Sequence, residues 1–355
     1  MIKTLRKDLL LILAVGAVFL SLSYAIGFVT DRSPKMAEVP TAFLSGERAP
    51  KPQPNTVRVW TKPTFEKTAV LNSTSLKAPE KMQADNNGNI FVIDWSDLRV
   101  KEFSPEGKLL KTFGEETGSP DAFVNPTGFS VDSGGNLWVC DLKQQRIGVL
   151  NKDGSKRTIK PQNTIYRIAA IGDRMITMVA PGDSRLFETY DLSGQQLKSF
   201  GELLEDQSHK GIILDGDIVA DAANNGIIYG ARYVGIIGAY DAEGKQRFLV
   251  QTIDNVPPPP VLATEVRQKV KPNTTRPILS LSVLDNELYV LSGVHPDGSA
   301  GSGGKVMDVY NEQDGRYLYS WELPEVATEA IVVSNYIYIR SNKEVTVWRF
   351  KSNAS

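Results

Sequence analysis

The feature that most constrains this chain is a short turn that recurs along it, mostly at intervals of 40 to 50 residues and once at a longer interval. Each copy begins with an aromatic or aliphatic residue, continues with polar residues and ends in glycine. The copies are Phe103–Gly107, Leu150–Gly154, Tyr190–Gly194, Tyr240–Gly244 and, with one extra residue, Tyr310–Gly315. Glycine readily adopts the positive φ that a tight turn between antiparallel strands requires. The chain is therefore expected to be a series of β-hairpins.

A second turn signal lies upstream of the first one, each time before an apolar run. Asp85–Asn89 precedes Ile90–Asp94, and Asp132–Asn136 precedes Leu137–Asp141. Together the two signals predict six units that begin near residues 79, 126, 168, 217, 279 and 329. Four short strands per unit at this period are typical of a β-propeller. The sequence thus predicts an all-β fold, a six-bladed propeller.

The last unit shows only three strand-like runs, within residues 330–348. Val57–Trp60 is a strand-like run that belongs to no unit. We expect this N-terminal run to supply the missing outer strand and to close the ring, because closure hides sheet edges that would otherwise invite aggregation.

The N-terminus carries a membrane-targeting pattern. Lys3, Arg6 and Lys7 precede an uncharged run from Leu9 to Val29. These 21 residues would span about 30 Å as a helix, which is enough for one bilayer crossing. The basic flank predicts a single-pass membrane protein with the propeller outside the cytoplasm. The alternative is a signal peptide cleaved after Ser23–Ala25, which would make the protein secreted or periplasmic.

The domain organisation follows from these segments. Residues 1–30 are expected to be a transmembrane anchor or signal peptide, residues 31–55 a proline-rich linker, and residues 56–355 the propeller. Proline fixes φ and removes a donor, so the linker is expected to be extended and solvated and to hold the propeller away from the membrane. The largest insertion, Pro257–Pro277, is expected to be a surface loop or a stiff polyproline ligand.

Composition argues against several functions. The net charge of -1 is unlike that of a nucleic-acid binder. The single cysteine, Cys140, cannot form an intrachain disulfide, and the two histidines, His209 and His295, suggest neither a cysteine enzyme nor a histidine-bound metal. Common catalytic motifs are also absent from the sequence. We therefore expect no catalytic residues, no metal ligands and no cofactor. A bound calcium ion is expected only under the alternative function given below.

The second unit resembles an NHL repeat. Pro126–Asp132 is followed by Gly135–Val139 and Asp141, and then by an arginine that opens the third strand in Arg146–Leu150. The chain thus resembles NHL-repeat and TolB-like six-bladed propellers. That resemblance implies a fold shared by protein and RNA binders, sensor domains and metal-dependent lyases, with lactonases among related propellers. Fold alone does not choose among these functions.

Some polar residues recur from blade to blade and others are particular to one blade. Asp94 and Asp141, with Arg99 and Arg146, recur at equal spacing, which predicts a structural role. The candidate binding residues lie in the turns between second and third strands and in the links between blades. They are Trp95, Asp97, Tyr166, Arg167, Arg232 and Tyr233. Aromatic and arginine side chains often anchor partners. The alternative role for Trp95 and Tyr233 is packing between blades.

We therefore expect a membrane-tethered recognition or scaffold propeller that binds a protein, peptide or glycan partner, including a docking platform within an envelope machine. The alternative function is a calcium-dependent hydrolase that resembles lactonases, with oxygen ligands from Glu, Asn and Asp in the central channel.

Overall fold

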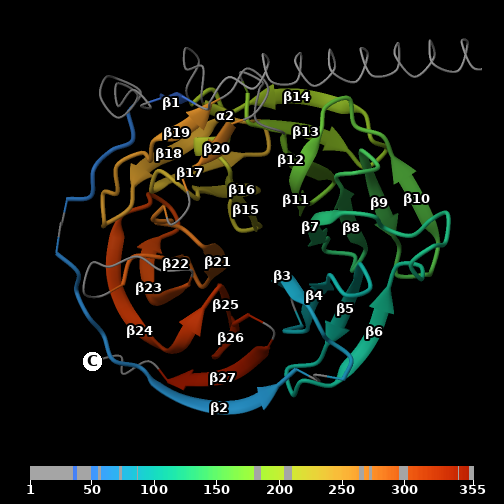
Figure 1. Ribbon diagram of the computed structural model, residues 1–355, viewed down its shortest axis with the longest axis horizontal. Coiled ribbons are helices and arrows are strands. Elements are labelled where there is room, and N and C mark those ends of the chain that lie inside the picture. The colour runs from blue at the N-terminus through green and yellow to red at the C-terminus, as the bar shows by residue number, and fades with distance from the viewer. Residues whose placement is uncertain are drawn as a thin grey trace, which may run out of the picture.

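The computed structural model describes residues 35–37, 49–54, 57–71, 74–85, 87–179, 185–203, 210–263, 268–271, 274–295, 303–342 and 344–351. Within these residues, six antiparallel sheets of four strands form a ring (Figure 1). The predicted six-bladed β-propeller is confirmed.

Each blade is named here from its innermost strand outward. Blade 1 contains β3 (Pro79–Ala84), β4 (Ile90–Asp94), β5 (Arg99–Phe103) and β6 (Leu109–Phe113). Blade 2 contains β7 (Pro126–Val131), β8 (Leu137–Asp141), β9 (Arg146–Leu150) and β10 (Lys156–Ile159). Blade 3 contains β11 (Ile165–Ile171), β12 (Arg174–Val179), β13 (Phe187–Asp191) and β14 (Gln196–Phe200). Blade 4 contains β15 (Gly216–Asp221), β16 (Gly226–Ala231), β17 (Ile236–Asp241) and β18 (Gln246–Gln251). Blade 5 contains β21 (Ser280–Leu284), β22 (Glu287–Ser292), β23 (Gly304–Asn311) and β24 (Tyr317–Ala327). Blade 6 contains β25 (Glu329–Val333), β26 (Tyr336–Arg340), β27 (Val345–Lys351) and, as its outer strand, β2 (Thr64–Val70).

The hydrophobic core lies between neighbouring blades. Every residue of β4 and of β8 is buried, because both faces of these middle strands are covered by adjacent sheets. Trp138 of blade 2, for example, packs in one cluster with Ile168 and Met175 of blade 3. The continuous apolar runs in the sequence therefore correspond to strands that are covered on both faces.

The recurring turns and aspartates have the structural roles that the sequence predicts. Gly107 and Gly154, in two of the turns between third and fourth strands, have φ values of 84° and 89°. Asp94 accepts hydrogen bonds from the backbone N–H groups of Lys77 (3.0 Å) and Ala78 (2.9 Å). Asp141 does the same for Val124 and Asn125 in blade 2. Each carboxylate thus fixes the link that leads into the first strand of its own blade.

The ring is closed by an N-terminal strand, as predicted, but the strand is not Val57–Trp60. The closing strand is β2, which pairs antiparallel with β27, with Phe65 opposite Phe350. Residues 57–61 lie instead against the outer edge of blade 5, where the Ser320 N–H donates to the Val59 carbonyl (2.8 Å) and the Thr61 N–H donates to the Ser320 carbonyl (2.8 Å). That edge of β24 is unpaired within its own sheet, so the passing chain covers it before it reaches blade 6.

Residues 49–54 and 57–61, here called the strap, run along the outside of blades 4 and 5. Lys51 bridges to Val250 on β18. The buried amide of Gln53 donates to the carbonyls of Gln251 (2.8 Å) and Gly315 (3.0 Å) and accepts from the Tyr317 N–H (2.8 Å). Lys51, Pro52 and Pro54 are exposed, but the backbone of Lys51 and the side chain of Gln53 are bonded to the propeller, so this part of the expected linker is docked on the blades.

A small three-stranded sheet involves residues near the start of the expected linker. β1 (Lys35–Ala37) pairs with β19 (Val261–Ala263), which pairs with β20 (Gln268–Val270). β19 and β20 belong to the insertion that was expected to be a loop. Among the residues that the structure describes, no helix is long and apolar enough to span a bilayer. The expected anchor, residues 1–30, lies outside the described residues.

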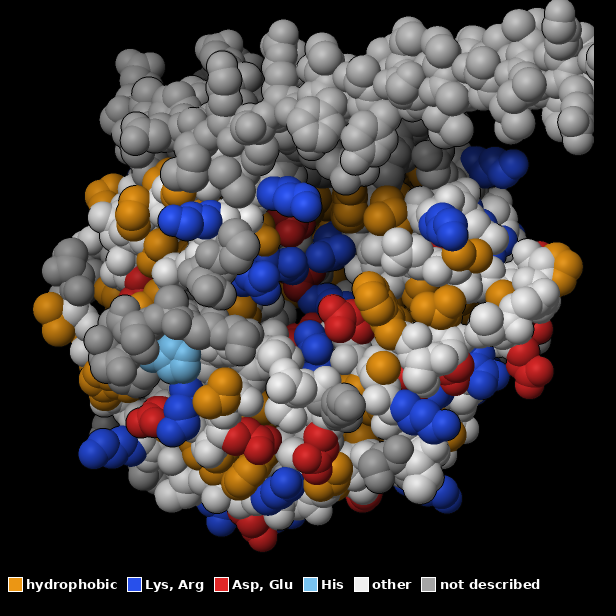
Figure 2. All heavy atoms as spheres, viewed as in Figure 1, with side chains coloured by type: hydrophobic (Ala, Val, Ile, Leu, Met, Phe, Trp, Pro, Cys, Tyr) orange, Lys and Arg blue, Asp and Glu red, His pale blue; other side chains and the backbone are white. Residues whose placement is uncertain are grey.

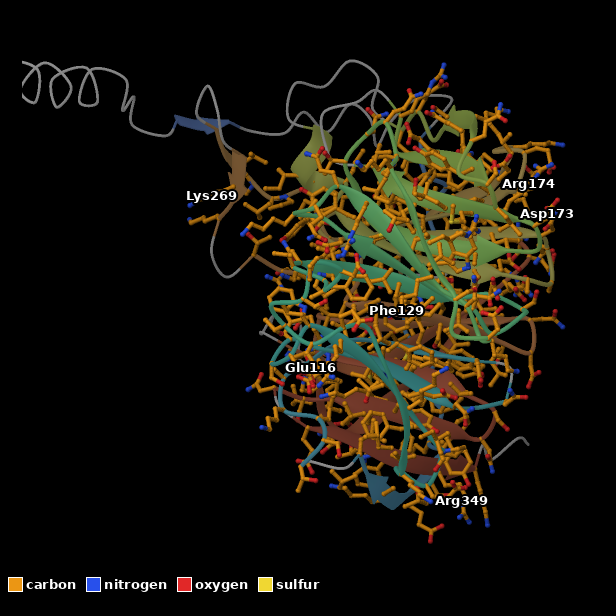
Figure 3. All side chains as sticks on the ribbon, turned by 90° about the vertical axis from the view of Figure 1, so that its right-hand side faces the viewer. Glu116, Phe129, Asp173, Arg174, Lys269 and Arg349 are labelled. Atoms are coloured by element: carbon orange, nitrogen blue, oxygen red, sulfur yellow. The ribbon has the colours of Figure 1, made fainter. Side chains whose placement is uncertain are left out.

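The two faces of the ring carry different connections. The front face, turned toward the viewer in Figures 1 and 2, carries the links between blades and the turns between second and third strands. Figure 3 shows Glu116 and Lys269 on the front side and Asp173 and Arg174 on the back side.

Candidate functional site

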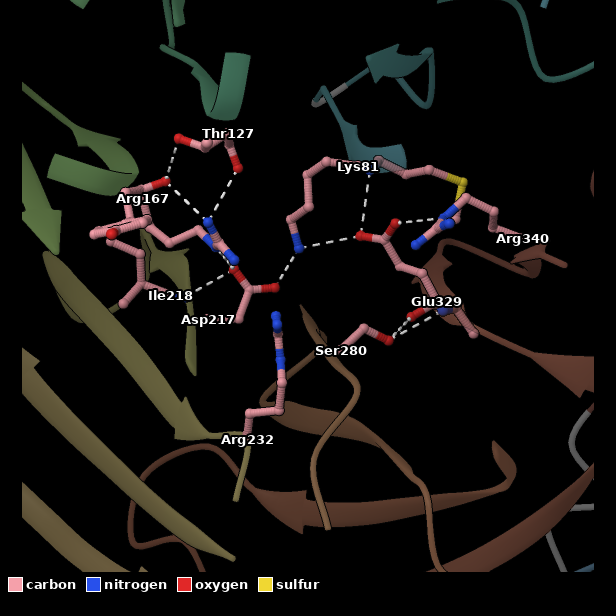
Figure 4. A network of polar contacts seen from close by, with 12 residues as sticks. Lys81, Thr127, Arg167, Asp217, Ile218, Arg232, Ser280, Glu329 and Arg340 are labelled. Carbon is pink, nitrogen blue, oxygen red and sulfur yellow. Dashed lines mark hydrogen bonds and ion pairs between the residues drawn. The ribbon is translucent and has the colours of Figure 1, made fainter. Parts of the chain in front are cut away.

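Charged side chains converge at the front end of the central channel. Every inner strand starts at the front face, so a residue near the start of such a strand can point into the channel there. Lys81 lies on β3, Arg167 on β11, Asp217 on β15 and Glu329 on β25. Figure 2 shows a hollow in the centre of this face where acidic and basic side chains gather, and Figure 4 shows the residues from close by. We call Lys81, Arg167, Asp215, Asp217, Arg232, Glu329 and Arg340 the channel cluster.

Lys81 connects three blades across the channel. Its Nζ forms ion pairs with Asp217 of blade 4 and with Glu329 of blade 6, where the Oε1 atom is 3.0 Å away. Glu329 Oε1 also accepts from the backbone N–H of Met82 (3.2 Å). These contacts hold blades 1, 4 and 6 in register at the mouth.

Asp217 and Glu329, the two buried carboxylates that pair with Lys81, each have a second cation beside them. Arg167 Nε lies 3.6 Å from Asp217 Oδ1, and Arg340 Nε donates to Glu329 Oε2 at 3.1 Å. The side chains of Asp217 and Glu329 are only 5% and 3% exposed. Removing two such charges from water is costly unless each is paired, which the cluster achieves.

The ion pairs set the protonation states of the cluster. Burial alone would raise the pKa of Asp217, but the charges of Lys81 and Arg167 outweigh burial and lower it. Burial alone would lower the pKa of Lys81, but the carboxylates of Asp217 and Glu329 raise it. Lys81 and Asp217 are therefore both charged at neutral pH.

Arg232 is the cation of the cluster that is most open to solvent. Its side chain is 25% exposed, against 12% to 16% for Lys81, Arg167 and Arg340. Its Nη1 lies 3.3 Å from Asp215 Oδ2, and Figure 4 shows the guanidinium pointing into the same space as Asp217. Arg340 Nη1 also lies 3.6 Å from Oε2 of Glu80, so the four cations of the cluster are matched by four carboxylates. Arg232 is the cation that is most accessible at the mouth.

Two of the six predicted binding residues, Arg167 and Arg232, belong to this cluster. Tyr166 is half-buried, and its carbonyl accepts from Thr127 Oγ1 (3.1 Å) and Arg167 Nη1 (3.0 Å), so it supports Arg167 through the backbone. Tyr233 follows Arg232 and stacks with the Arg276 guanidinium, which lies 5.9 Å from its ring centre.

The other two predicted residues, Trp95 and Asp97, lie in the turn after β4 in blade 1. Asp97 Oδ2 pairs with Arg99 (3.0 Å) and Lys101 (2.9 Å), and Asp97 lines an open pocket of about 450 Å³. The Trp95 side chain is 49% exposed, so its alternative role in packing between blades is not supported. The structure shows no contact that joins this turn to the channel cluster within the part of the chain it describes.

Sequence reasoning missed five members of the cluster, which are Lys81, Asp215, Asp217, Glu329 and Arg340. They share no local motif, and they come from three different blades. The available signal was position, because each lies at or near the front end of an inner or second strand.

The carboxylates of the channel cluster are not arranged as the calcium site of the alternative function would be. A calcium site needs several oxygen ligands from carboxylates, amides or carbonyls. Here the two buried carboxylates are each held by lysine or arginine. In the described ranges, no group of three or more His, Cys, Asp or Glu residues is arranged to hold a metal ion.

Comparisons with known proteins support the fold. No family model matches the chain. Human NHL repeat-containing protein 3 is 29% identical over 91 residues, which cover 25% of this chain and 26% of that protein. The match thus spans about a quarter of the curated relative, and it supports the predicted resemblance to NHL repeats.

Solved structures are similar over most of the chain. A protein from Bacteroides fragilis has a TM-score of 0.57 at 11% identity, covering 85% of this chain and 99% of that one. A streptogramin B lyase has a TM-score of 0.52 at 12% identity (81% and 98% covered), and a member of the DUF4221 family from Bacteroides vulgatus has 0.50 at 12% (83% and 98% covered). Identities this low show the fold alone. The chain is thus a six-bladed β-propeller that is similar to an NHL-repeat protein over part of its length.

Proposed function

We propose that this protein is a membrane-tethered recognition propeller outside the cytoplasm, and that a protein, peptide or glycan partner docks on its front face. The channel cluster is the observation that supports this proposal. It places four cations from several blades at one mouth, and the most exposed of them is an arginine.

The chemistry of the mouth favours a partner with an acidic group. The guanidinium is planar and offers several N–H donors, so it suits carboxylates and other planar anions. Arg232 pairs directly with Asp215 at 3.3 Å, and the carboxylates of Asp217 and Glu329 also act on its charge. Asp217 and Glu329 are more buried than Arg232 and are themselves paired with Lys81. An acidic side chain or an acidic sugar would therefore meet Arg232 first.

The tether is proposed from the sequence. Leu9–Val29 is long enough and apolar enough for one crossing, and its basic flank favours a cytoplasmic N-terminus. The propeller would then lie on the other side of the membrane.

A charge reversal at the mouth tests the docking proposal. The full chain and its Arg232→Glu variant would be crosslinked in native membranes, and captured partners identified by mass spectrometry. We expect a partner of the parent chain to be lost from Arg232→Glu, because like charges replace an attractive contact.

The matched control is Arg174→Glu on the back face, whose side chain is also partly exposed. This variant should retain the partner. Loss of the partner from both variants, or retention in both, would contradict docking at the channel mouth. Thermal unfolding of both variants separates lost binding from lost folding.

A further inference from the structure

We infer that the front face is held toward the bilayer, with the β1–β19–β20 sheet against anionic lipid headgroups. This inference rests on the proposed membrane tether. It adds an orientation and a contact surface, and it follows from where the chain enters the propeller.

The chain enters at the front face. Lys35 of β1 lies opposite Ala263 of β19, and Ala37 lies opposite Val261. Figure 3 shows this sheet standing out beyond the front side of the ring, with Lys269 of β20 on it.

The sheet is attached to the body of the propeller. Val261 is fully buried in a cluster with Ile213 of the short helix α2 (Lys210–Ile213), Leu249 of blade 4 and Phe187 of blade 3. β20 also contacts α2. A strand that pairs with β19 is therefore fixed relative to the blades, and β1 is joined to a defined place on the front face.

The segment of chain that connects the proposed anchor to this sheet, here called the lead, is short. Only residues 30–34 lie between Val29 and Lys35. Even a fully extended chain would span about 20 Å over this interval. Blade strands of five to seven residues are themselves about 17 to 23 Å long. A lead of this length that starts from a sheet in front of the ring does not reach around to a bilayer at the back.

The charge of the exposed sheet suits a lipid surface. Lys269 and Lys271 are both exposed, and so is Arg276, which lies between this sheet and β21. A basic side chain is attracted to an anionic bilayer surface, so these side chains reinforce the orientation that the short lead imposes.

The orientation determines which molecules reach the channel cluster. The mouth opens on the same face as the sheet, so a partner must enter the space between the propeller and the membrane. A segment that is itself held at the membrane surface fits this geometry.

Energy transfer from one labelled cysteine to the bilayer tests the orientation. The full chain would carry Glu116→Cys on the front or Asp173→Cys on the back, both exposed positions. The native Cys140 is fully buried and burial raises the pKa of its thiol, so the parent chain is the unlabelled control. Each variant would be placed in vesicles of phosphatidylcholine and phosphatidylglycerol that carry an acceptor on their headgroups.

We expect stronger transfer from position 116 than from position 173. Equal transfer, or stronger transfer from position 173, would overturn the orientation. If the parent chain fails to float with the vesicles, the tether itself is wrong and the orientation with it. Flotation with equal transfer removes the orientation alone, so the two failures are distinguishable.

Charge reversal tests the lipid contact separately. Lys269→Glu with Lys271→Glu should reduce transfer from position 116 in vesicles that contain phosphatidylglycerol. The back-face pair Lys152→Glu and Arg174→Glu changes the charge equally and should leave transfer unchanged. Equal effects of the two pairs would overturn the headgroup contact.

Discussion

At the scale of single residues, the buried carboxylates of this propeller differ in their neighbours. Asp217 lies beside Lys81 and Arg167, which lower its pKa. Glu312, in the turn after β23, lies instead beside another carboxyl group, that of Asp221 at the end of β15. Ionised Asp217 therefore stabilises the folded ring, whereas ionised Glu312 destabilises it.

Asp217→Asn should lower the free energy of unfolding by about 3 to 5 kcal/mol at neutral pH, since it leaves buried cations without their carboxylate. The pKa of Asp217 is lowered from 3.8, so its contribution is present above about pH 4 and is lost as the pH falls below that value. The difference from the parent chain should therefore shrink in acid. Urea unfolding measures it, and Asp173→Asn, at a side chain that is 90% exposed, should have no effect.

Glu312→Gln should stabilise the protein above about pH 7. Burial and the Asp221 carboxylate raise the pKa of Glu312 from 4.5 to about 7, while Arg247, which pairs with Asp221, opposes the shift. A raised carboxyl pKa means that the free energy of unfolding falls as the pH rises between these two values, by up to about 3 kcal/mol.

Urea unfolding across this pH range checks the prediction for Glu312. The parent chain should lose stability toward pH 7, and Glu312→Gln should not. Parallel pH profiles for the two proteins would show that Glu312 is not the titrating group.

At the scale of elements, the strap is held by a buried ion-pair group. Arg58 Nε donates to Asp308 Oδ1 (3.0 Å), and its Nη2 donates to Asp254 Oδ2 (2.5 Å). Ser320 Oγ, on the strand that the strap covers, also donates to Asp308 (2.5 Å). The strap therefore places one cation between two carboxylates that the blades have buried.

Arg58→Ala should lower the free energy of unfolding by about 3 to 5 kcal/mol, because two buried carboxylates lose their cation. Burial already raises the pKa of Asp308 despite Arg58, so the loss should be smaller in acid, where Asp308 can take up a proton. Arg349→Ala removes a more exposed pair with Glu66 (3.6 Å) between β27 and β2 and should cost at most about 1 kcal/mol. Similar losses for the two variants, measured by urea unfolding, would contradict this account.

The elements also show how much could be predicted from the sequence. The blades could be predicted because glycine turns and buried apolar runs mark the middle strands. β2 could not, because most side chains of this outer strand are exposed and it lacks a simple alternation, whereas Val57, Val59 and Trp60 have strong strand propensity. Those three are exposed, and their stretch of chain is held at blade 5 by backbone hydrogen bonds and by the side chain of Arg58.

At the scale of the whole molecule, the channel cluster exists only because the ring is closed. Lys81, Asp217 and Glu329 are separated by more than a hundred residues in sequence and meet across the axis of the propeller. No local pattern indicates such a site. Arg167 and Arg232 could be identified because residue type and strand position place them on the front face, but their common environment could not.

The pairing of β2 with β27 also determines when the molecule can be completed. β2 is the first blade strand to be synthesised, and β27 ends at Lys351, 281 residues after Val70. At usual rates of translation, that interval lasts on the order of tens of seconds. Throughout it, the first strand has no partner and the first blade has no neighbour on one side. The nascent chain therefore carries an open edge until its final segment emerges, and any chain that stops before β27 keeps that edge permanently.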